Sequence, residues 1–292
     1  MDTFLQFFIS GILNGGIYAL IGIGLVLIFK ASGIFNFAVG QLLLVGAFAT
    51  WAFLKWLELP VWLSVLLAMV VAALVGLIIE RLVTRPLIGQ PVLSAVMALL
   101  ALSVMLKGVF AFIFGPATVS YPADVLPGTP VSLSGASFSG ELTWGFLIAV
   151  IVFGIVTLLF YRSRIGLAMR GTAEDHQLAQ ATGINVKHIF AITWMAAVLV
   201  AAIGGIIIGS KVGIGIHFTP LLGVKVIPVV LFGGLESIKG CFVAGLIVGI
   251  LESIVGGYVD PNLMVITPYA ILLLVLLFRP YGLFGQKRIE RI

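Results

Sequence analysis

The sequence has few charged residues for its length. Only 9% of its 292 residues are Asp, Glu, Lys or Arg, whereas 61% are hydrophobic, and the mean hydropathy is +1.26. Soluble domains carry about 25% charged residues. Continuous apolar runs such as VWLSVLLAMVVAALVGLII at 61–79 lack the period-two alternation of a membrane β-barrel and have the length of a membrane-spanning helix. The expected fold class is therefore an all-α polytopic membrane protein.

Cysteine and histidine are also scarce. The single Cys241 excludes a disulfide framework and a cysteine zinc cluster, and the three histidines show no metal-ligand spacing. The sequence contains no G-x-x-x-x-G-K-[ST] phosphate loop and no G-x-S-x-G motif, so we expect neither an ATPase, nor an enzyme of another class, nor a cofactor bound by this chain. Because Asp2 stands where a signal peptide would carry basic residues, we expect no cleaved signal.

Nine apolar segments are predicted to be membrane spans within a single domain that covers 1–292. They lie at 4–29, 37–57, 61–83, 93–113, 142–161, 189–210, 222–236, 241–258 and 264–279. The seventh is the shortest, and the turn at Glu58–Pro60 between the second and third is tight. Counts of eight or ten helices therefore stay open.

The distribution of basic residues predicts the orientation of these spans. If the polar segment at 162–188 faces the cytoplasm, all of the 16 lysines and arginines except Lys55, Lys107, Lys211 and Lys225 also fall on the cytoplasmic side. Cytoplasmic loops are enriched in Lys and Arg, so we predict that the N-terminus is outside and the C-terminus inside.

One long loop, at 114–141, is expected on the outer side. It contains no basic residue, and turn signals at Pro127-Gly128 and Ser139-Gly140 favour a small, ordered hairpin. The chain also contains 35 glycines. Small-xxx-small spacings at Gly11/Gly15, Gly205/Gly209/Gly213 and Gly245/Gly249 predict close approach of helix backbones, with no further role implied.

The largest polar segment is RSRIGLAMRGTAEDHQLAQATGINVKH at 162–188. Thr172 followed by Asp175 resembles a capping box, and Glu174 and Asp175 would lie in the first helical turn, at the positive end of the helix dipole. Gly183 suits the left-handed residue that ends a helix. We therefore predict a helix at 173–182, too short to be stable alone, which rests on the bundle and on a partner. A solvated connector is the alternative.

Several motifs resemble those of the LivH/LivM-type permeases of branched-chain amino acid ABC transporters. The segment RSRIGLAMRGTAEDHQLAQATGIN resembles the cytoplasmic coupling segment of that family. Further resemblances, over nearly the whole chain, are GLVLIFKASGIFNFAVGQLLLVGAF with its Asn36-Phe37-Ala38, ERLVTRPL at 80–87, LFGGLESIKGCFVAGLIVG, and FRPYGLFG at 278–285. The absence of a long N-terminal extension favours the LivH type.

The resemblance implies the permease subunit of an importer in the bacterial cytoplasmic (inner) membrane. Its partners would be a second permease (LivM-like or a second copy), two ATP-binding subunits and an extracytoplasmic substrate-binding protein, with lipid around it and no nucleic acid. ATP and Mg would be bound by the ATPase subunits. The residues that would couple to them are Arg170, Thr172, Glu174, Asp175, Ala179 and Gly183.

The chain departs from the family's common N-F-A-H-G-E, because Val39 and Gln41 stand where the family has a histidine and a carboxylate. A path with fewer ionic groups favours branched-chain or other hydrophobic amino acids, with aromatic acids, urea or amides as the alternative. Asn36 could bind substrate, but bracing the loop after the first span is its favoured role.

Two ionisable residues, Lys225 and Glu252, fall inside predicted spans. A charge there costs at least about 2.5–3.5 kcal/mol unless it faces water or a counter-charge. A structural pair, a polar lining of the translocation path and misplaced span boundaries all stay open, and Lys107 raises the same question. The candidates for the translocation path are Asn36, Phe37, Gln41, Lys225 and Glu252.

The sequence gives less support to two other functional classes. An ion-coupled secondary transporter would need a relay of ionisable groups within the spans, for which Lys225 and Glu252 are slender support. An integral membrane enzyme would need a ligand cluster or a nucleophile with its base, and the sequence suggests none. Co-elution of ATPase subunits on purification would favour the importer over both.

Overall fold

The structure is a computed structural model that describes residues 2–133, 136–174 and 176–285. Within these residues, seven helices are long and apolar enough to cross a membrane. They are α1 (Asp2–Ser32), α2 (Val39–Trp56), α3 (Val61–Ile79), α4 (Val92–Phe114), α5 (Gly140–Arg162), α8 (Val186–Val212) and α11 (Ile238–Tyr258). Two shorter apolar stretches are α9 (Phe218–Val224) followed by α10 (Val226–Gly233), and α12 (Leu263–Phe278). All nine predicted segments are therefore helical, but the seventh is broken in two.

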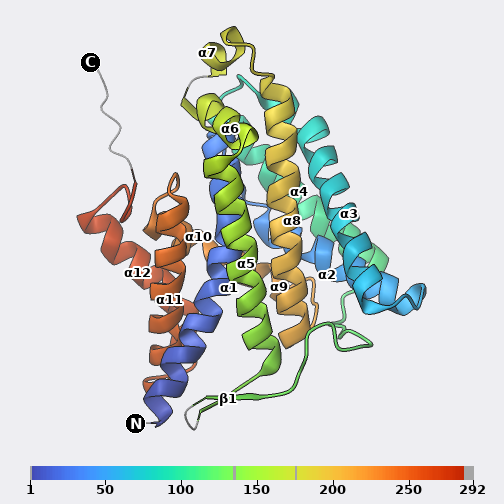
Figure 1. Ribbon diagram of the computed structural model, residues 1–292, viewed down its shortest axis with the longest axis vertical. Coiled ribbons are helices and arrows are strands. Elements are labelled where there is room, and N and C mark those ends of the chain that lie inside the picture. The colour runs from blue at the N-terminus through green and yellow to red at the C-terminus, as the bar shows by residue number, and fades with distance from the viewer. Residues whose placement is uncertain (1, 134–135, 175, 286–292) are drawn as a thin grey trace.

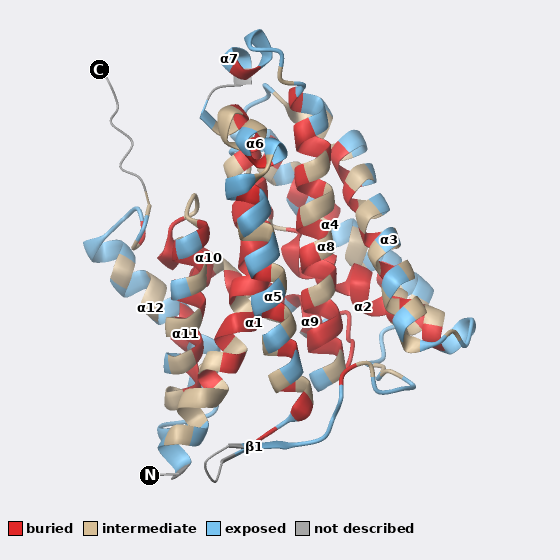
Figure 2. Ribbon diagram, viewed as in Figure 1, coloured by how far each residue is buried: buried red, intermediate tan, exposed pale blue. Residues whose placement is uncertain are grey.

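The bundle is built around α1 and α8. These two helices are mostly buried, whereas only 28%, 11% and 17% of the apolar windows of α3, α4 and α5 are buried (Figure 2). The exposed side chains of the outer helices are apolar, as with Val104 and Phe112 on α4 and Leu158 on α5. A helix satisfies its own backbone hydrogen bonds, so an apolar outer surface of this kind is suited to lipid.

Glycines bring α1 and α11 into backbone contact. A Cβ on Gly11 or Gly15 would overlap the backbone of α11 near Ile250 and Gly245, and a Cβ on Gly249 would overlap the backbone of α1. The predicted small-residue spacing is thus confirmed for this pair of helices. It positions Glu252, one turn beyond Gly249, against the centre of the bundle.

The glycine series Gly205/Gly209/Gly213 on and after α8 has two structural roles. Gly205 on α8 lies against the backbone of Leu43 on α2, where a Cβ would not fit. Gly213 has a positive φ of 82° and ends α8. The backbone of Gly213 accordingly needs a left-handed conformation that most residues avoid.

The two ends of the bundle carry different elements. The N-terminal end of α1 lies at the same end as a small hairpin, and α6 (Arg164–Glu174) and α7 (His176–Ala181) lie at the opposite end (Figure 1). The hairpin consists of β1 (Val131–Leu133) and β2 (Ala136–Phe138), which pair antiparallel with Val131 opposite Phe138. The expected hairpin is therefore present, and the two turn signals flank it instead of forming its turn.

The segment before the hairpin is fastened to the bundle. Trp51 Nε1 donates a hydrogen bond to the Ser120 carbonyl at 3.1 Å, and Val119 forms an antiparallel bridge with Ile214, just after α8. The Tyr121 hydroxyl donates to the Ala47 carbonyl at 3.3 Å. Burial raises the pKa of Tyr121, so this hydroxyl stays a neutral donor.

Candidate functional site

In the described residues, the polar segment is helical over Arg164–Glu174 (α6) and His176–Ala181 (α7), so the predicted helix start at 173 is wrong. Helical structure begins at Arg164, because Ser163 caps α6 by accepting a hydrogen bond from Gly166 N at 2.9 Å. Thr172 is buried inside α6, and its hydroxyl donates to the Ala168 carbonyl at 2.8 Å instead of capping a helix start. Asp175, the other half of the supposed capping box, lies outside the described residues. Glu174 is the eleventh residue of α6 and therefore does not lie in its first turn.

The predicted end of the second helix is confirmed. Gly183 has a positive φ of 87° and follows α7. Its N–H donates to the Gln180 carbonyl at 3.0 Å, and Ile184 N donates to the Ala179 carbonyl at 3.0 Å. This pair of hydrogen bonds is the Schellman arrangement, which uses a left-handed residue to close a helix.

One side of α7 is anchored on the bundle. Ala179 is buried in a small apolar cluster with Ala31 of α1 and with Val186 and Phe190 of α8. The end of α1 is held at the same place, because Lys30 Nζ donates to the Glu236 carbonyl at 3.1 Å and lies 5.3 Å from the centre of the Phe160 ring. A displacement of α7 would therefore also displace the ends of α1 and α8 that contact it.

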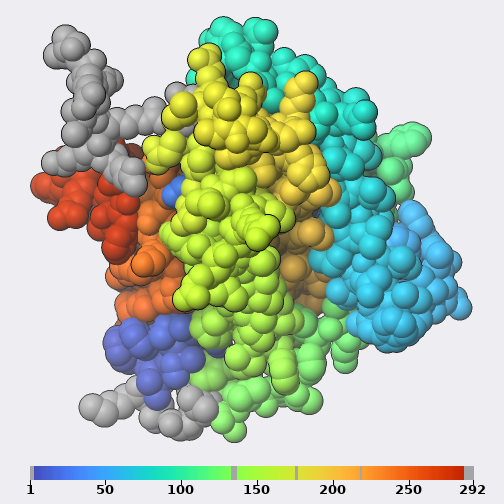
Figure 3. All heavy atoms as spheres, turned by 45° about the horizontal axis from the view of Figure 1, so that its top comes forward, coloured from blue at the N-terminus to red at the C-terminus, as the bar shows by residue number. Residues whose placement is uncertain are grey.

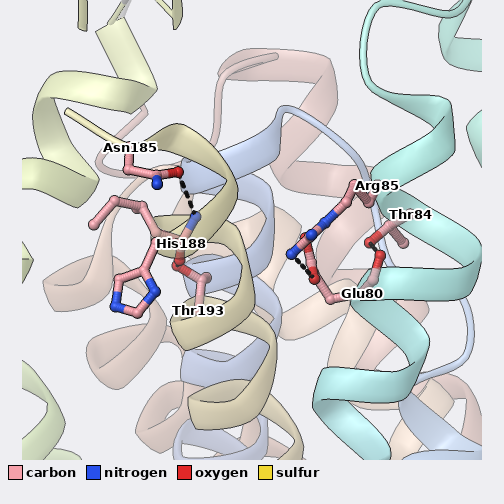
Figure 4. Close-up of polar contacts among 7 residues, drawn as sticks. Glu80, Thr84, Arg85, Asn185, His188 and Thr193 are labelled. Carbon is pink, nitrogen blue, oxygen red and sulfur yellow. Dashed lines mark hydrogen bonds and ion pairs between the residues drawn. The ribbon is translucent and has the colours of Figure 1, made fainter. Parts of the chain in front are cut away.

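Local polar contacts fix this end of the bundle (Figure 4). Asn185 caps α8 by accepting a hydrogen bond from His188 N at 3.2 Å. At the end of α3, the buried Glu80 pairs with Arg85 at 2.8 Å, across a π-turn at Glu80–Thr84. The chain therefore enters α8 and leaves α3 in defined directions.

The opposite side of the α6–α7 segment is open (Figure 3). Glu174 is exposed, and the apolar side chains of Leu167 and Leu178 are 63% and 66% exposed. Arg170 lies partly buried, with its guanidinium 5.8 Å from the centre of the Tyr161 ring. The segment thus combines a fixed inner side with an exposed side of mixed apolar and acidic character.

The second candidate site lies in the bundle, where Lys225 Nζ contacts Glu252 Oε1 at 2.7 Å. Their side chains are 13% and 5% exposed. The pairing of these two residues, one of the alternatives left open by the sequence, is therefore present. Both also line a cavity of about 200 Å³ between α1, α8, α11 and the α9–α10 region. Either role considered from the sequence, structural pair or path lining, is compatible with this geometry.

Lys225 stands at the break in the seventh span. Only Lys225 separates α9 from α10, and even together the two helices are shorter than the roughly 20 residues that cross a core of about 30 Å. Pro228 has no N–H to donate to the carbonyl of Val224, four residues earlier, so one helical hydrogen bond is lost beside Lys225, whose own backbone stays right-handed helical. The break places an ionisable side chain next to the cavity.

A second non-helical stretch, at 33–38, leads into α2. Asn36 is 1% exposed, and its Oδ1 accepts a hydrogen bond from Ala38 N at 2.9 Å, so its amide braces this turn. Gly40 then lies against Pro220, and Gly223 against Gly40, which packs the start of α2 on α9. Backbone that is not helical is tolerated in a membrane protein where it is covered by protein, as it is here.

The predicted path residues fall into two groups. Lys225 and Glu252 line the cavity, but Asn36, Phe37 and Gln41 are not among the residues that line it. Phe37 packs on Phe35 with ring centres 4.9 Å apart, and within the described residues Gln41 Oε1 is buried without a hydrogen-bond partner. The two groups are connected through α9, which contacts α2 and ends at Lys225.

Sequence reasoning missed most residues of the cavity, including the polar residues Asn14, Tyr18, Lys211 and Ser253. From the sequence, Lys211 is only one of the four basic residues that do not fall on the predicted cytoplasmic side. Asn14 gave no signal, because one amide in a long apolar helix is common and its partner is remote in sequence. Lys107, the other lysine in question, is half-buried on α4 and has no ion-pair partner among the described residues.

Helices of membrane-spanning length, a broken span and a buried ion pair beside a cavity define the class as a multi-pass membrane protein. Residues 7–276 match the family described as "Branched-chain amino acid transport system / permease component". The chain belongs to this family of ABC transporter permeases.

Individual relatives cover nearly the whole chain. The chain is 29% identical to the high-affinity branched-chain amino acid permease protein LivH of Escherichia coli K12, and 30% identical to BraD of Pseudomonas aeruginosa. Both alignments cover 99% of this chain and 98% of the relative. It is also 26% identical to the guanosine ABC transporter permease protein NupQ of Bacillus subtilis, over 85% of this chain and 83% of the relative. The family therefore includes permeases named for different solutes.

Proposed function

We propose that this chain is the membrane-spanning permease subunit of an importer for branched-chain or other hydrophobic amino acids. In the bacterial inner membrane it would work with a second permease, two ATPase subunits and an extracytoplasmic binding protein. The N-terminus and the loop at 114–141 would lie outside, and the α6–α7 segment would lie in the cytoplasm. ATP and Mg would be bound by the ATPase subunits.

The observation that carries the coupling part of the proposal is the two-sided α6–α7 segment. Its inner side is anchored to α1 and α8 through Ala179, and its outer side presents Glu174, Leu167 and Leu178 to solvent. Apolar side chains exposed on a polar segment are typical of a surface that a partner covers. A groove on the ATPase subunit would hold this segment and move it when ATP binds.

The substrate part rests on the family and on the character of the interior. LivH and BraD are named for branched-chain amino acids, and the interior of this chain has few charges apart from the Lys225–Glu252 pair. The similarity to NupQ favours a nucleoside as the second candidate. Aromatic acids, urea and amides remain further alternatives within the same transporter class.

The test is leucine uptake and ATP hydrolysis by the complete importer in vesicles. Reversal of charge in the variant Glu174→Lys/Asp175→Lys should reduce leucine uptake at least about tenfold, because it replaces attraction by repulsion at the ATPase contact. The amount of folded permease in the membrane should not change. ATP hydrolysis should no longer respond to leucine and the binding protein.

The matched control is Glu58→Lys, at an exposed turn at the other end of the bundle. It makes the same kind of charge reversal, at one residue instead of two, away from the proposed contact, and it should leave ATP hydrolysis and the co-purification of ATPase subunits intact. Normal uptake and normal coupling in the Glu174→Lys/Asp175→Lys variant would contradict the docking role of α6–α7. Uptake of guanosine in place of leucine by the unaltered importer would contradict the substrate.

A further inference from the structure

The cavity beside the ion pair has a second lysine at its mouth. Lys211, in the last turn of α8, is exposed, and its Nζ donates a hydrogen bond to Asn14 Oδ1 of α1 at 2.9 Å. The cavity extends from this pair to Lys225 and Glu252. Its volume of about 200 Å³ is below the roughly 300–1,000 Å³ of pockets for drug-sized ligands, so it suits only a small solute.

The inner end of the cavity offers an acceptor. Glu252 Oε1 is occupied by Lys225, but Oε2 has no hydrogen-bond partner among the described residues. The Tyr18 hydroxyl lies beside this carboxylate, within reach of donating a hydrogen bond to it. A buried acceptor without a donor costs about 1–3 kcal/mol, and more if charged. A ligand that brings N–H donors to Oε2 would recover this cost.

Between the two polar ends the wall is apolar. Ile17 of α1, Ile208 of α8, Leu222 of α9 and Met264 of α12 line it. The cavity therefore has a cation at one end, a carboxylate oxygen at the other, and aliphatic side chains between them. Because Lys225 is neutralised by Glu252, the charge available to a ligand at the mouth is that of Lys211.

Resting on the proposed function, we propose that this cavity is a transient binding site for the zwitterion of an aliphatic α-amino acid. The α-carboxylate accepts from Lys211 Nζ, which Asn14 Oδ1 holds in place, the α-ammonium donates to Glu252 Oε2, and the side chain packs on the apolar wall. A zwitterion brings no net charge and satisfies both poles. A solute with only one of the two charges leaves the other pole unpaired, and such a loss is discriminated strongly.

The first experiment measures binding of radiolabelled leucine to the assembled permease and ATPase complex in nanodiscs, without the binding protein. Lys211→Gln should weaken leucine binding about tenfold or more, since it removes a charge-assisted contact. Lys55→Gln, the same substitution at an exposed lysine of α2 outside the cavity, should not change binding. Leucinamide, which lacks the carboxylate, should bind the unaltered complex more weakly than leucine does. It should bind the Lys211→Gln complex as well as leucine does.

The second experiment separates a ligand role of Glu252 from a structural one. The charge swap Lys225→Glu/Glu252→Lys keeps a buried ion pair but moves the carboxylate to α9–α10. We expect a thermal midpoint close to that of the unaltered protein and loss of leucine binding of about tenfold or more. A purely structural pair would retain leucine binding after the swap.

The outcomes distinguish this proposal from the function on which it rests. If the complete importer takes up leucine but Lys211→Gln and the swap bind leucine as the unaltered complex does, the zwitterion site is wrong and the importer assignment stands. If the complete importer takes up no leucine, the proposed function fails and this site fails with it.

Discussion

Buried charges in this protein are balanced only while both partners are present. Lys225 and Glu252 are 27 positions apart in the sequence. Their contact at 2.7 Å joins the break in the seventh span to α11. Glu80 and Arg85 make a second pair, in which the carboxylate is the buried partner. Removal of one member of such a pair leaves an uncompensated charge, which costs more than the pair contributed.

Glu252→Gln should therefore destabilise the protein strongly. Lys225 would remain partly buried without a counter-charge, and breaking a buried pair costs about 3–5 kcal/mol. The double variant Lys225→Met/Glu252→Leu removes both charges and should recover most of this stability. Thermal unfolding of the purified protein in detergent measures both effects. Equal losses in the single and double variants would show that the charge balance is not the cause.

At the scale of helices, backbone contact replaces the hydrophobic effect as the source of specificity. In lipid an apolar helix surface gains little by leaving its solvent, so close packing of small residues selects the partner helix. The series Gly11/Gly15 on α1 and Gly245/Gly249 on α11 does this, and it sets the position of Glu252.

Gly249→Leu should therefore separate α1 from α11. The added side chain would meet the backbone of Gly11 and Gly15, which cannot move aside as a flexible side chain can. We expect a loss of about 3 kcal/mol or more, at the upper end for overpacking, and a lower yield of folded protein on size-exclusion chromatography. Gly154→Leu on the exposed face of α5, with no atom within 4 Å of its Cβ position, is the control and should be nearly neutral. Similar losses in both variants would contradict this packing argument.

The helices themselves could be predicted, because apolar length is a local signal that lipid enforces. Helix boundaries in the polar segment could not. Thr172 and Asp175 have the spacing of a capping box. However, Ser163, nine positions before Thr172, is the N-cap of α6, and Thr172 is buried inside that helix. Gly183 was predictable, since a left-handed glycine after a helix is specified by its neighbours alone.

The site could be predicted only in part for a related reason. The cost of a charge in a span indicates that Lys225 and Glu252 have partners or water, and their mutual contact satisfies this requirement. The roles of Asn14 and Lys211 depend on the contact between α1 and α8. These two residues are 197 positions apart in the sequence, so no local pattern encodes their contact. Asn36 shows the converse case, because its hydrogen bond two residues along the chain is a local feature that its residue type favours.

On the scale of the whole molecule, the two ends of the bundle are built for different surroundings. One end carries α6 and α7 and the polar turns around Glu80 and Asn185, and the other carries the N-terminus and the β1–β2 hairpin (Figure 1). The central claim of the proposed function is that the α6–α7 end faces the cytoplasm and its ATPases, while the hairpin end faces the binding protein. Both assignments depend on one orientation in the membrane.

Thiol labelling by a membrane-impermeant reagent tests this orientation most directly. The native Cys241 is fully buried, so the background should be low. Ser132→Cys in the exposed strand β1 should be labelled in intact inner-membrane spheroplasts, and Gln180→Cys on the exposed side of α7 should be labelled only after the membrane is permeabilised. Labelling of Gln180→Cys in intact spheroplasts, with Ser132→Cys protected, would invert the topology and contradict the docking of α6–α7 on cytoplasmic ATPases.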